Sequence, residues 1–269
     1  MYEFPSKTWE LELERNLALY LVEHFYSIQG EGKYTGTPSL FFRFGGCNMK
    51  CEGFACSETA SNGVEVLGCD TVYAVNKENF SHNWIPINKA DELLNILNHY
   101  DLPPHVDIVL TGGEPLIYAN DEIFINFLKA LHVAGHNITF ETNGSLHVDF
   151  DKYPIYKECI FALSVKLSNS NEPLNKRVRG DIIYNIASQS KESFFKFSID
   201  AESINLGLEE EIFSIIQHSP KTKVYCMPLG GNKSEVEANT EPLIEFCKEK
   251  GYNFSDRLHI RIWDQNKGV

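Results

Sequence analysis

The chain has 269 residues and a formal net charge of −13, and it contains no dense block of lysine or arginine. This acidic balance argues against nucleic-acid binding through counterion release, and it suits a protein with a small-molecule ligand. No apolar stretch reaches the roughly 20 residues of a membrane span, and the polar segment Met1–Leu11 lacks the apolar core of a signal peptide. Seven cysteines, an odd number, do not resemble a disulfide framework. We therefore expect a reducing, cytoplasmic setting.

Before the cysteines, one β-like run at 21–26 precedes an apolar run at 39–44. Beyond the cysteines the chain alternates strand-like and helix-like patterns. Together with 39–44, the later apolar runs predict strands at 106–110, 138–140, 160–165, 194–199 and 224–227. Helical spacing predicts helices at 90–99, 121–134, 181–188, 208–217 and 235–250.

Near-continuous apolar strands that alternate with helices are typical of a parallel sheet covered on both faces. The pattern therefore predicts an α/β fold, either an open barrel or a doubly wound sheet. No Pro- or Ser-rich linker interrupts it, which predicts a single domain over 1–269.

Three cysteines follow the strand-like run 39–44. Cys47 and Cys51 are separated by three residues, and Cys69 follows Cys51 after seventeen more, within the triplet Cys-Asp-Thr. Neighbouring thiolates hold soft metals, so the two candidates are an iron–sulfur cluster and zinc. With Cys56 this window holds four thiols, enough for a closed zinc site in a structural protein, although only the first spacing is tight.

Polar motifs follow three successive predicted strands, at the edge where a barrel places its chemistry. Paired glycines let a backbone approach a ligand closely, and Glu114 has the chemistry to accept hydrogen bonds from an amine. Each motif alone is compatible with a simple turn, but together they predict one continuous rim. The motifs are Thr111-Gly112-Gly113-Glu114-Pro115, Glu141-Thr142-Asn143-Gly144 and Ser164-Val165-Lys166.

Two features ahead of the cysteines indicate a polar partner. Gln29 and Glu31 flank a glycine, an arrangement that suits either a turn or a hydrogen-bonding site for a heterocycle. Arg43 lies inside the apolar run 39–44, where an unpaired guanidinium is costly. Arg43 therefore needs an acidic protein partner or an anionic ligand, and the sequence leaves both open.

These motifs carry a family resemblance. The chain resembles the radical S-adenosylmethionine (SAM) enzymes and, among them, the family of 7-carboxy-7-deazaguanine synthases in queuosine precursor biosynthesis. The resemblance covers nearly the whole chain and rests on the cysteines, Gly-Gly-Glu-Pro, Gln-Gly-Glu-Gly and Cys-Asp-Thr. It implies a partial (β/α)6 radical SAM barrel with an N-terminal strand extension and an insert, residues 52–68, in the cluster-binding loop.

The resemblance also implies a chemistry. Cys47, Cys51 and Cys69 would hold a 4Fe–4S cluster, and SAM would bind at its open iron. The substrate in this family is 6-carboxy-5,6,7,8-tetrahydropterin, whose ring contracts with loss of ammonia to give 7-carboxy-7-deazaguanine. A Mg²⁺ ion assists and would be held partly by Thr71. A homodimer and an electron donor such as flavodoxin or ferredoxin are implied as well.

Further roles carry over by position. Contacts with SAM are implied for Gly113, Glu114, Thr142, Asn143, Ser164 and Lys166. Contacts with the pterin are implied for Gln29, Glu31, Arg43, Thr111 and His259, with the planar fork of Arg43 on the substrate carboxylate.

The chain departs from the family pattern in the cysteine loop. The superfamily places two residues between its second and third cysteines, whereas here the insert 52–68 intervenes and brings in Cys56 as a rival ligand. We favour Cys69, because only Cys69 has the Asp-Thr continuation. Gly68 stands where the family tends to have an aromatic residue, and Val165 stands where it often has proline. The alternative within the superfamily is an activating enzyme that acts on a partner protein.

Overall fold

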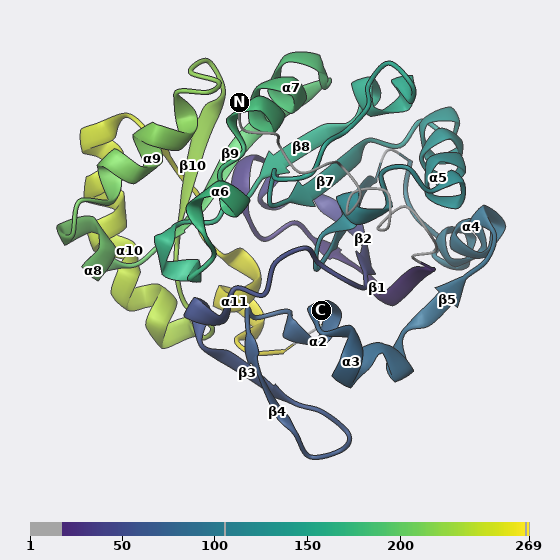
Figure 1. The fold of residues 1–269 in the computed structure, drawn as a ribbon, viewed down its shortest axis with the longest axis horizontal. Coiled ribbons are helices and arrows are strands. Elements are labelled where there is room, and N and C mark those ends of the chain that lie inside the picture. The colour runs from purple at the N-terminus through teal and green to yellow at the C-terminus, as the bar shows by residue number, and fades with distance from the viewer. Residues whose placement is uncertain (1–17, 105, 267, 269) are drawn as a thin grey trace, which may run out of the picture.

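The computed structural model describes residues 18–104, 106–266 and 268, so the segment Met1–Leu11 lies outside the described residues. A nine-stranded sheet with the order β11-β10-β9-β8-β7-β6-β2-β1-β5 organises the molecule (Figure 1). Its parallel strands are β2 (Pro38–Phe44), β6 (Asp107–Gly112), β7 (Ile138–Thr142), β8 (Ile160–Leu163), β9 (Glu192–Ile199), β10 (Lys223–Pro228) and β11 (Asn253–Phe254). The antiparallel strands are β1 (Leu19–Ile28) and β5 (Ile85–Ile87).

The strand order distinguishes the two predicted architectures. From β2 through β6 to β10, each parallel strand pairs with the next one along the chain. A doubly wound sheet reverses its order at a switch point, and this series has no reversal. The predicted α/β fold of the partial-barrel type is therefore confirmed, with β1 as the N-terminal extension. The short edge strand β5 was not predicted, and the predicted strand 160–165 ends earlier, at Leu163.

Helices follow the barrel strands, and the five longest match the predicted segments. None of the described helices is long and apolar enough to span a bilayer. The predicted five are α4 (Ala90–His99), α5 (Glu122–Val133), α7 (Gly180–Gln189), α9 (Leu208–Ile216) and α10 (Lys233–Lys250). The shorter helices are α2 (Val72–Val75), α3 (Lys77–Phe80), α6 (Leu174–Arg177), α8 (Ala201–Asn205) and α11 (Leu258–Trp263). Single 3-10 turns are η1 (Gly32–Tyr34), η2 (Glu52–Phe54), η3 (Ser81–Asn83), η4 (Pro115–Tyr118), η5 (Pro154–Glu158) and η6 (Ser168–Ser170).

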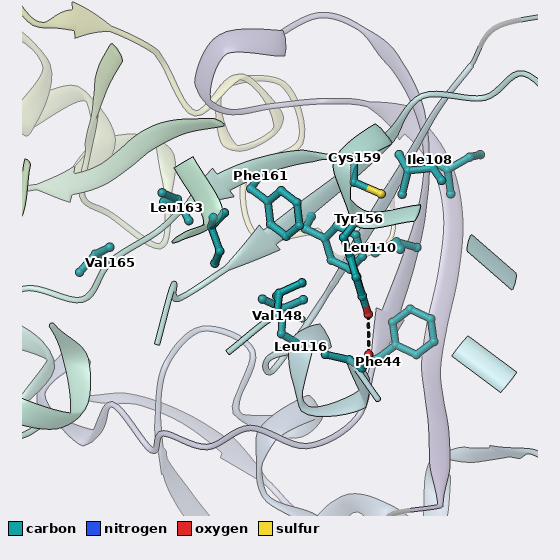
Figure 2. Packing of buried hydrophobic residues seen from close by; sticks show 14 of the residues in the cluster. Phe44, Ile108, Leu110, Leu116, Val148, Tyr156, Cys159, Phe161, Leu163 and Val165 are labelled. Atoms are coloured by element: carbon teal, nitrogen blue, oxygen red, sulfur yellow. Dashed lines mark hydrogen bonds between the residues drawn. The ribbon is translucent and has the colours of Figure 1, made fainter. Parts of the chain in front are cut away.

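Aromatic side chains from the strands and helices fill the core. The rings of Phe140 on β7 and Phe161 on β8 stack with centroids 5.0 Å apart. Tyr156 is fully buried, and its hydroxyl donates a hydrogen bond to the main-chain oxygen of Ala119 over 3.0 Å (Figure 2). Three cysteines pack in the same core as small apolar groups, as predicted: Cys159, Cys226 and Cys247.

The insert 52–68 forms a hairpin of β3 (Cys56–Thr59) and β4 (Glu65–Gly68) that projects from the body of the molecule (Figure 1). In its register Cys56 lies opposite Gly68. Cys56 and Cys69 therefore both lie at the base of the hairpin.

A buried carboxylate at the start of β6 makes the stability of the fold depend on pH. Asp107 is 5% exposed, and both its oxygens lie 3.0 Å from the donating hydroxyl of Thr139. Burial raises the pKa of Asp107 from 3.8 to about 6. The folded state thus binds this proton more tightly than the unfolded chain does. The free energy of unfolding therefore falls as pH rises from about 4 to about 6, by about 3 kcal/mol in all.

We expect Asp107→Asn to remove most of this pH dependence, because asparagine does not titrate. Denaturant unfolding of both proteins between pH 4 and pH 7 measures the effect. Asp151→Asn, at a position whose side chain is 93% exposed, serves as the control and should keep the wild-type profile. Parallel profiles for wild type and Asp107→Asn would contradict the assignment.

Candidate active site

The polar motifs predicted to form a rim do meet at the carboxyl ends of the parallel strands. The cysteine loop follows β2, Thr111 and Gly112 end β6, and Thr142 ends β7. Ser164 follows β8, and its N–H donates to the carbonyl of Thr142 over 2.7 Å. Carboxyl ends of parallel strands share one edge of a sheet, so these side chains border a common space.

Glu114 connects the chain segments at the carboxyl ends of these strands through hydrogen bonds. Its carboxylate is fully buried and accepts hydrogen bonds from the hydroxyl of Thr142 (2.8 Å), the N–H of Asn143 (2.7 Å) and the N–H of Leu116 (3.0 Å). Its own N–H donates to the carbonyl of Gly46 over 2.9 Å, in the cysteine loop. Burial raises the pKa of Glu114, against the effect of these hydrogen bonds. Glu114 thus positions three chain segments, and its contact with the SAM amine stays a prediction.

Gly113 allows the cysteine loop to lie directly against β6. A Cβ at this position would lie 2.3 Å from the carbonyl oxygen of Gly46 and 2.9 Å from the Cβ of Cys47. No side chain fits there, so the glycine is required for close approach of two backbones. A second contact of the cysteine loop is polar: the side chain of Asn143, just after β7, donates to the side chain of Asn48 over 2.9 Å.

Three cysteines lie within electrostatic reach of one another in this loop. Burial raises the pKa of Cys47, of Cys51 (to about 11) and of Cys69, and repulsion by the other thiols raises it further for Cys47 and Cys51. Cys69 Sγ also lies 3.4 Å from the hydroxyl of Thr71. The charged neighbours that act most strongly on Cys56 are Asp70 and Cys69, not the first two cysteines. Cys56 therefore lies on the outer side of the group.

The donor set of three grouped thiols, with Cys56 on the outer side, fits a 4Fe–4S cluster. A closed structural zinc site needs four ligands, and thiolates around one zinc ion lie about 3.8 Å apart. A cube of four irons spaces its sulfur ligands more widely, and three of them leave one iron open. The positive charge of Lys166 opposes part of the burial-driven rise in the pKa of Cys51 and Cys69, although the pKa of both thiols stays raised.

Buried charges fill the barrel interior beside the cysteine loop. We call Glu31, Glu141, Lys196 and Arg257 the interior charge network. Lys196 on β9 donates to Glu31 over 2.8 Å and to Glu141 over 3.0 Å. Arg257, just before α11, donates to the second oxygen of Glu31 over 2.8 Å. Its far nitrogen lies 3.3 Å from Asp70, the residue after Cys69, so the network reaches the cysteine loop.

Attraction within the network outweighs the cost of burying its charges. Burial alone acts to raise the pKa of Glu31, yet Lys196 and Arg257 hold that pKa well below its usual range. Burial likewise acts to lower the pKa of Lys196, and the two glutamates raise it instead. Both carboxylates and the ammonium are therefore charged near neutral pH. Glu31 can act only as a hydrogen-bond acceptor in that state.

Most residues predicted to hold the pterin contact this network. Gln29 lies 3.3 Å from Glu141 through its amide nitrogen and accepts from the N–H of Glu31 over 3.0 Å. Thr111 hydrogen-bonds Glu141 and lowers its pKa. His259 Nε2 lies 3.8 Å from Glu31, and a Cβ on Gly30 would lie 2.1 Å from the His259 ring.

Arg43 has an acidic partner in the chain itself. Its Nε donates to Glu23 over 2.6 Å, and the hydroxyl of Tyr73 donates to the same carboxylate oxygen over 2.8 Å. Of the two possibilities that the sequence left open, a protein partner is present. Contact of Arg43 with a substrate carboxylate stays a prediction, and the pairing means that Glu23 would have to share or release the guanidinium.

Sequence reasoning missed three members of this site. Lys196 lies inside the apolar run 194–199, the same signal that singled out Arg43, so the pattern was sufficient to find it. Glu141 belongs to a motif that was noted without a role for its carboxylate. Arg257 gave no local signal, because its partners Glu31 and Asp70 are distant in sequence.

Comparisons with known proteins agree with this geometry. A family model described as a 4Fe-4S single cluster domain matches residues 28–187. A 7-carboxy-7-deazaguanine synthase from Halobacterium salinarum is 28% identical over 92% of this chain and 91% of its own length. The enzyme of that name from Hyperthermus butylicus is 29% identical over 92% of this chain and 94% of its own. The crystal structure of QueE from Escherichia coli shares the fold, with a TM-score of 0.63 at 18% identity, over 94% of this chain and all of that one.

The interior charge network generates a prediction about stability. We expect Lys196→Met to lower the free energy of unfolding at pH 7 by about 3–5 kcal/mol, because it leaves the largely buried carboxylate of Glu141 without a cation and removes one of the two cations that contact Glu31. Adding Glu141→Gln should restore part of the loss, and so should lowering the pH until the carboxylates protonate. Denaturant titration measures all three effects. Lys248→Met, at a position whose side chain is 66% exposed, is the matched control and should stay within about 0.5 kcal/mol of wild type.

Proposed function

Because a family model covers residues 28–187, the chain belongs to the family of 4Fe-4S single cluster domains, and we propose that it is a radical SAM enzyme of the 7-carboxy-7-deazaguanine synthase type. It converts 6-carboxy-5,6,7,8-tetrahydropterin to 7-carboxy-7-deazaguanine. Relatives with this enzyme's name match along more than nine tenths of the chain. The observation that carries the proposal is the position of the interior charge network directly beside the three cysteines.

The cysteine loop is the proposed site of the cluster and of SAM. Cys47, Cys51 and Cys69 would hold the cluster, which when bound would supply the electron for cleavage of SAM. Lys166 opposes part of the rise in the pKa of Cys51 and Cys69, and Gly113, just after β6, places no side chain beside Cys47. The rim residues that border this space, Glu114, Thr142, Asn143 and Ser164, are the proposed contacts of SAM, together with Gly113 and Lys166.

The interior charge network is the proposed pterin site. A pterin presents several N–H donors along one edge, and the ionised Glu31 is an acceptor of the matching kind. Gln29 and Thr111 contact Glu141, and His259 lies beside Glu31, so these side chains surround one polar volume. Arg43 binds the substrate carboxylate by exchanging Glu23 for it. The low pKa of Glu31 means that substrate binding does not require a prior proton loss from this group.

Three further features belong to the proposal. Thr71, whose hydroxyl lies 3.4 Å from Cys69 Sγ, contributes an oxygen ligand to a Mg²⁺ ion near the substrate carboxylate. A small acidic redox protein such as flavodoxin or ferredoxin reduces the cluster. The enzyme works as a homodimer in the cytoplasm.

The assay for this function is direct. Protein purified and reduced without oxygen is incubated with SAM, Mg²⁺ and 6-carboxy-5,6,7,8-tetrahydropterin, and products are identified by mass spectrometry. We expect 7-carboxy-7-deazaguanine together with 5′-deoxyadenosine. Cleavage of SAM without any deazapurine would refute the substrate assignment and favour an activating enzyme for a partner protein. The ion pairs of the barrel interior favour the small polar substrate, because their charged groups match its hydrogen-bonding edge.

The choice of the third cluster ligand is tested by substitution. We expect Cys69→Ala to lose most of the iron and sulfide bound after anaerobic reconstitution, because the cluster then lacks one of three anchors. Cys56→Ala should keep nearly the wild-type content, since Cys56 lies outside the group of three. Iron and sulfide analysis, with absorbance near ~400 nm as a second readout, decides the matter. The reverse pattern would make Cys56 the ligand.

A further inference from the structure

A cleft at the end of the barrel away from the cysteines gathers positive charge. Its volume is about 570 Å³, and it lies at the amino ends of β9 and β10, beside α7 and the loop after α9 (Figure 1). We call it the basic cleft. Four lysines line it against a single carboxylate, Glu192, although the whole chain carries a net charge of −13. The lysines are Lys33, Lys191, Lys221 and Lys223.

Lys221 and Lys223, two of the four lysines that line the basic cleft, form no ion pair within the described structure. Lys33 and the hydroxyl of Tyr34 both bind Glu192, which accounts for the carboxylate. Among the described residues, neither Lys221 nor Lys223 has a carboxylate within ion-pair distance. Two like charges on one short stretch repel each other, so their placement costs stability unless an anion joins them. At physiological salt the screening length is about 8 Å, so the local lysines outweigh the distant negative charge of the chain.

A second observation points to a missing hydrogen-bond partner. Ser190 is among the residues that line the basic cleft, and its hydroxyl oxygen is buried without a hydrogen-bond partner within the described structure. Buried hydroxyls in native proteins nearly always have a partner, and leaving one unpaired costs about 1–3 kcal/mol. The same lining holds the hydroxyls of Ser219 and Thr222, which lie 2.8 Å apart and hydrogen-bond each other, so one of the two can donate to a ligand. Lysines with several hydroxyls form a donor set for phosphate oxygens.

The rim adds a surface for an aromatic group. Tyr184 on α7 lines the basic cleft and is 63% exposed. A cavity of this volume accommodates a small molecule rather than a macromolecule. Exposed aromatic rings stack on nucleobases in a way that does not depend on sequence.

We propose that the basic cleft binds the polyphosphate group of a small molecule, with a nucleoside triphosphate as the favoured source. The phosphates lie between Lys221, Lys223 and the hydroxyl of Ser190, and the base lies against Tyr184. The site is separate from the cysteine loop and independent of the proposed activity, so it stands or falls on its own.

Calorimetry on the full, cluster-loaded protein tests the proposal, with saturating SAM and without added magnesium. ATP and inorganic tripolyphosphate are the two probes. We expect saturable binding of one equivalent, weakened about tenfold or more in the double variant Lys221→Glu with Lys223→Glu. The matched double variant Lys129→Glu with Lys248→Glu carries the same charge change on exposed helix positions outside the cleft, and should bind like wild type.

Two single variants sharpen the test. Ser190→Ala should weaken both probes severalfold while leaving the protein as stable as wild type or slightly more stable, because it removes an unpaired buried hydroxyl. Tyr184→Ser should weaken ATP more than tripolyphosphate if the nucleotide is the source, and neither probe selectively if free polyphosphate is. The proposal is overturned if neither probe binds, if SAM displaces ATP, or if both double variants bind alike.

Discussion

A buried lysine between two half-buried glutamates is the interaction on which the site depends. Lys196 joins Glu31, from the loop after β1, to Glu141 at the end of β7. These segments are far apart in the chain. Leaving the buried ammonium of Lys196 unpaired would be costly, so its two ion pairs hold the segments at a fixed separation. Arg257 brings the C-terminal part of the chain to the same point through its own bond to Glu31. The interior charge network therefore closes the open side of a partial barrel while it provides the polar lining of the site.

The arrangement also explains why ionised groups persist in a barrel interior. A lone carboxylate there would take up a proton, as the raised pKa of Asp107 illustrates at the opposite end of β6. Glu31 behaves in the opposite way because two cations contact its two oxygens. The same type of side chain is thus tuned in opposite directions by its partners, not by burial, which both share. The interior charge network therefore provides hydrogen-bond acceptors that stay ionised near neutral pH.

Sequence patterns predicted the fold well, because buried parallel strands and amphipathic helices each have a recognisable apolar pattern within their own stretch of sequence. Six barrel strands and five helices were placed this way, whereas β5 was missed, since a three-residue edge strand containing Pro86 has no usable period. The site was predicted in part. Motifs at strand ends named the rim, but the partner of Arg43 and the position of Arg257 depend on contacts between distant segments. Local patterns can show that a buried charge needs a partner, and only the fold identifies that partner.

The hairpin in the cysteine loop shows how an insert can lengthen a loop without separating the residues on either side of it. The two strands of a hairpin end beside each other, about 5 Å apart, so a hairpin adds length without adding distance. The register that pairs Cys56 with Gly68 returns the chain to its starting point and delivers Cys69 beside Cys51. Cys51 itself has a left-handed backbone, with φ of 52°, and its N–H donates to Glu172 over 3.0 Å. That left-handed turn comes just before the insert, and the pairing of the two hairpin strands brings the chain back beside it. An insert of seventeen residues then has the effect of a short turn, so a cysteine beyond the insert remains as close to Cys51 as one that follows it directly in sequence.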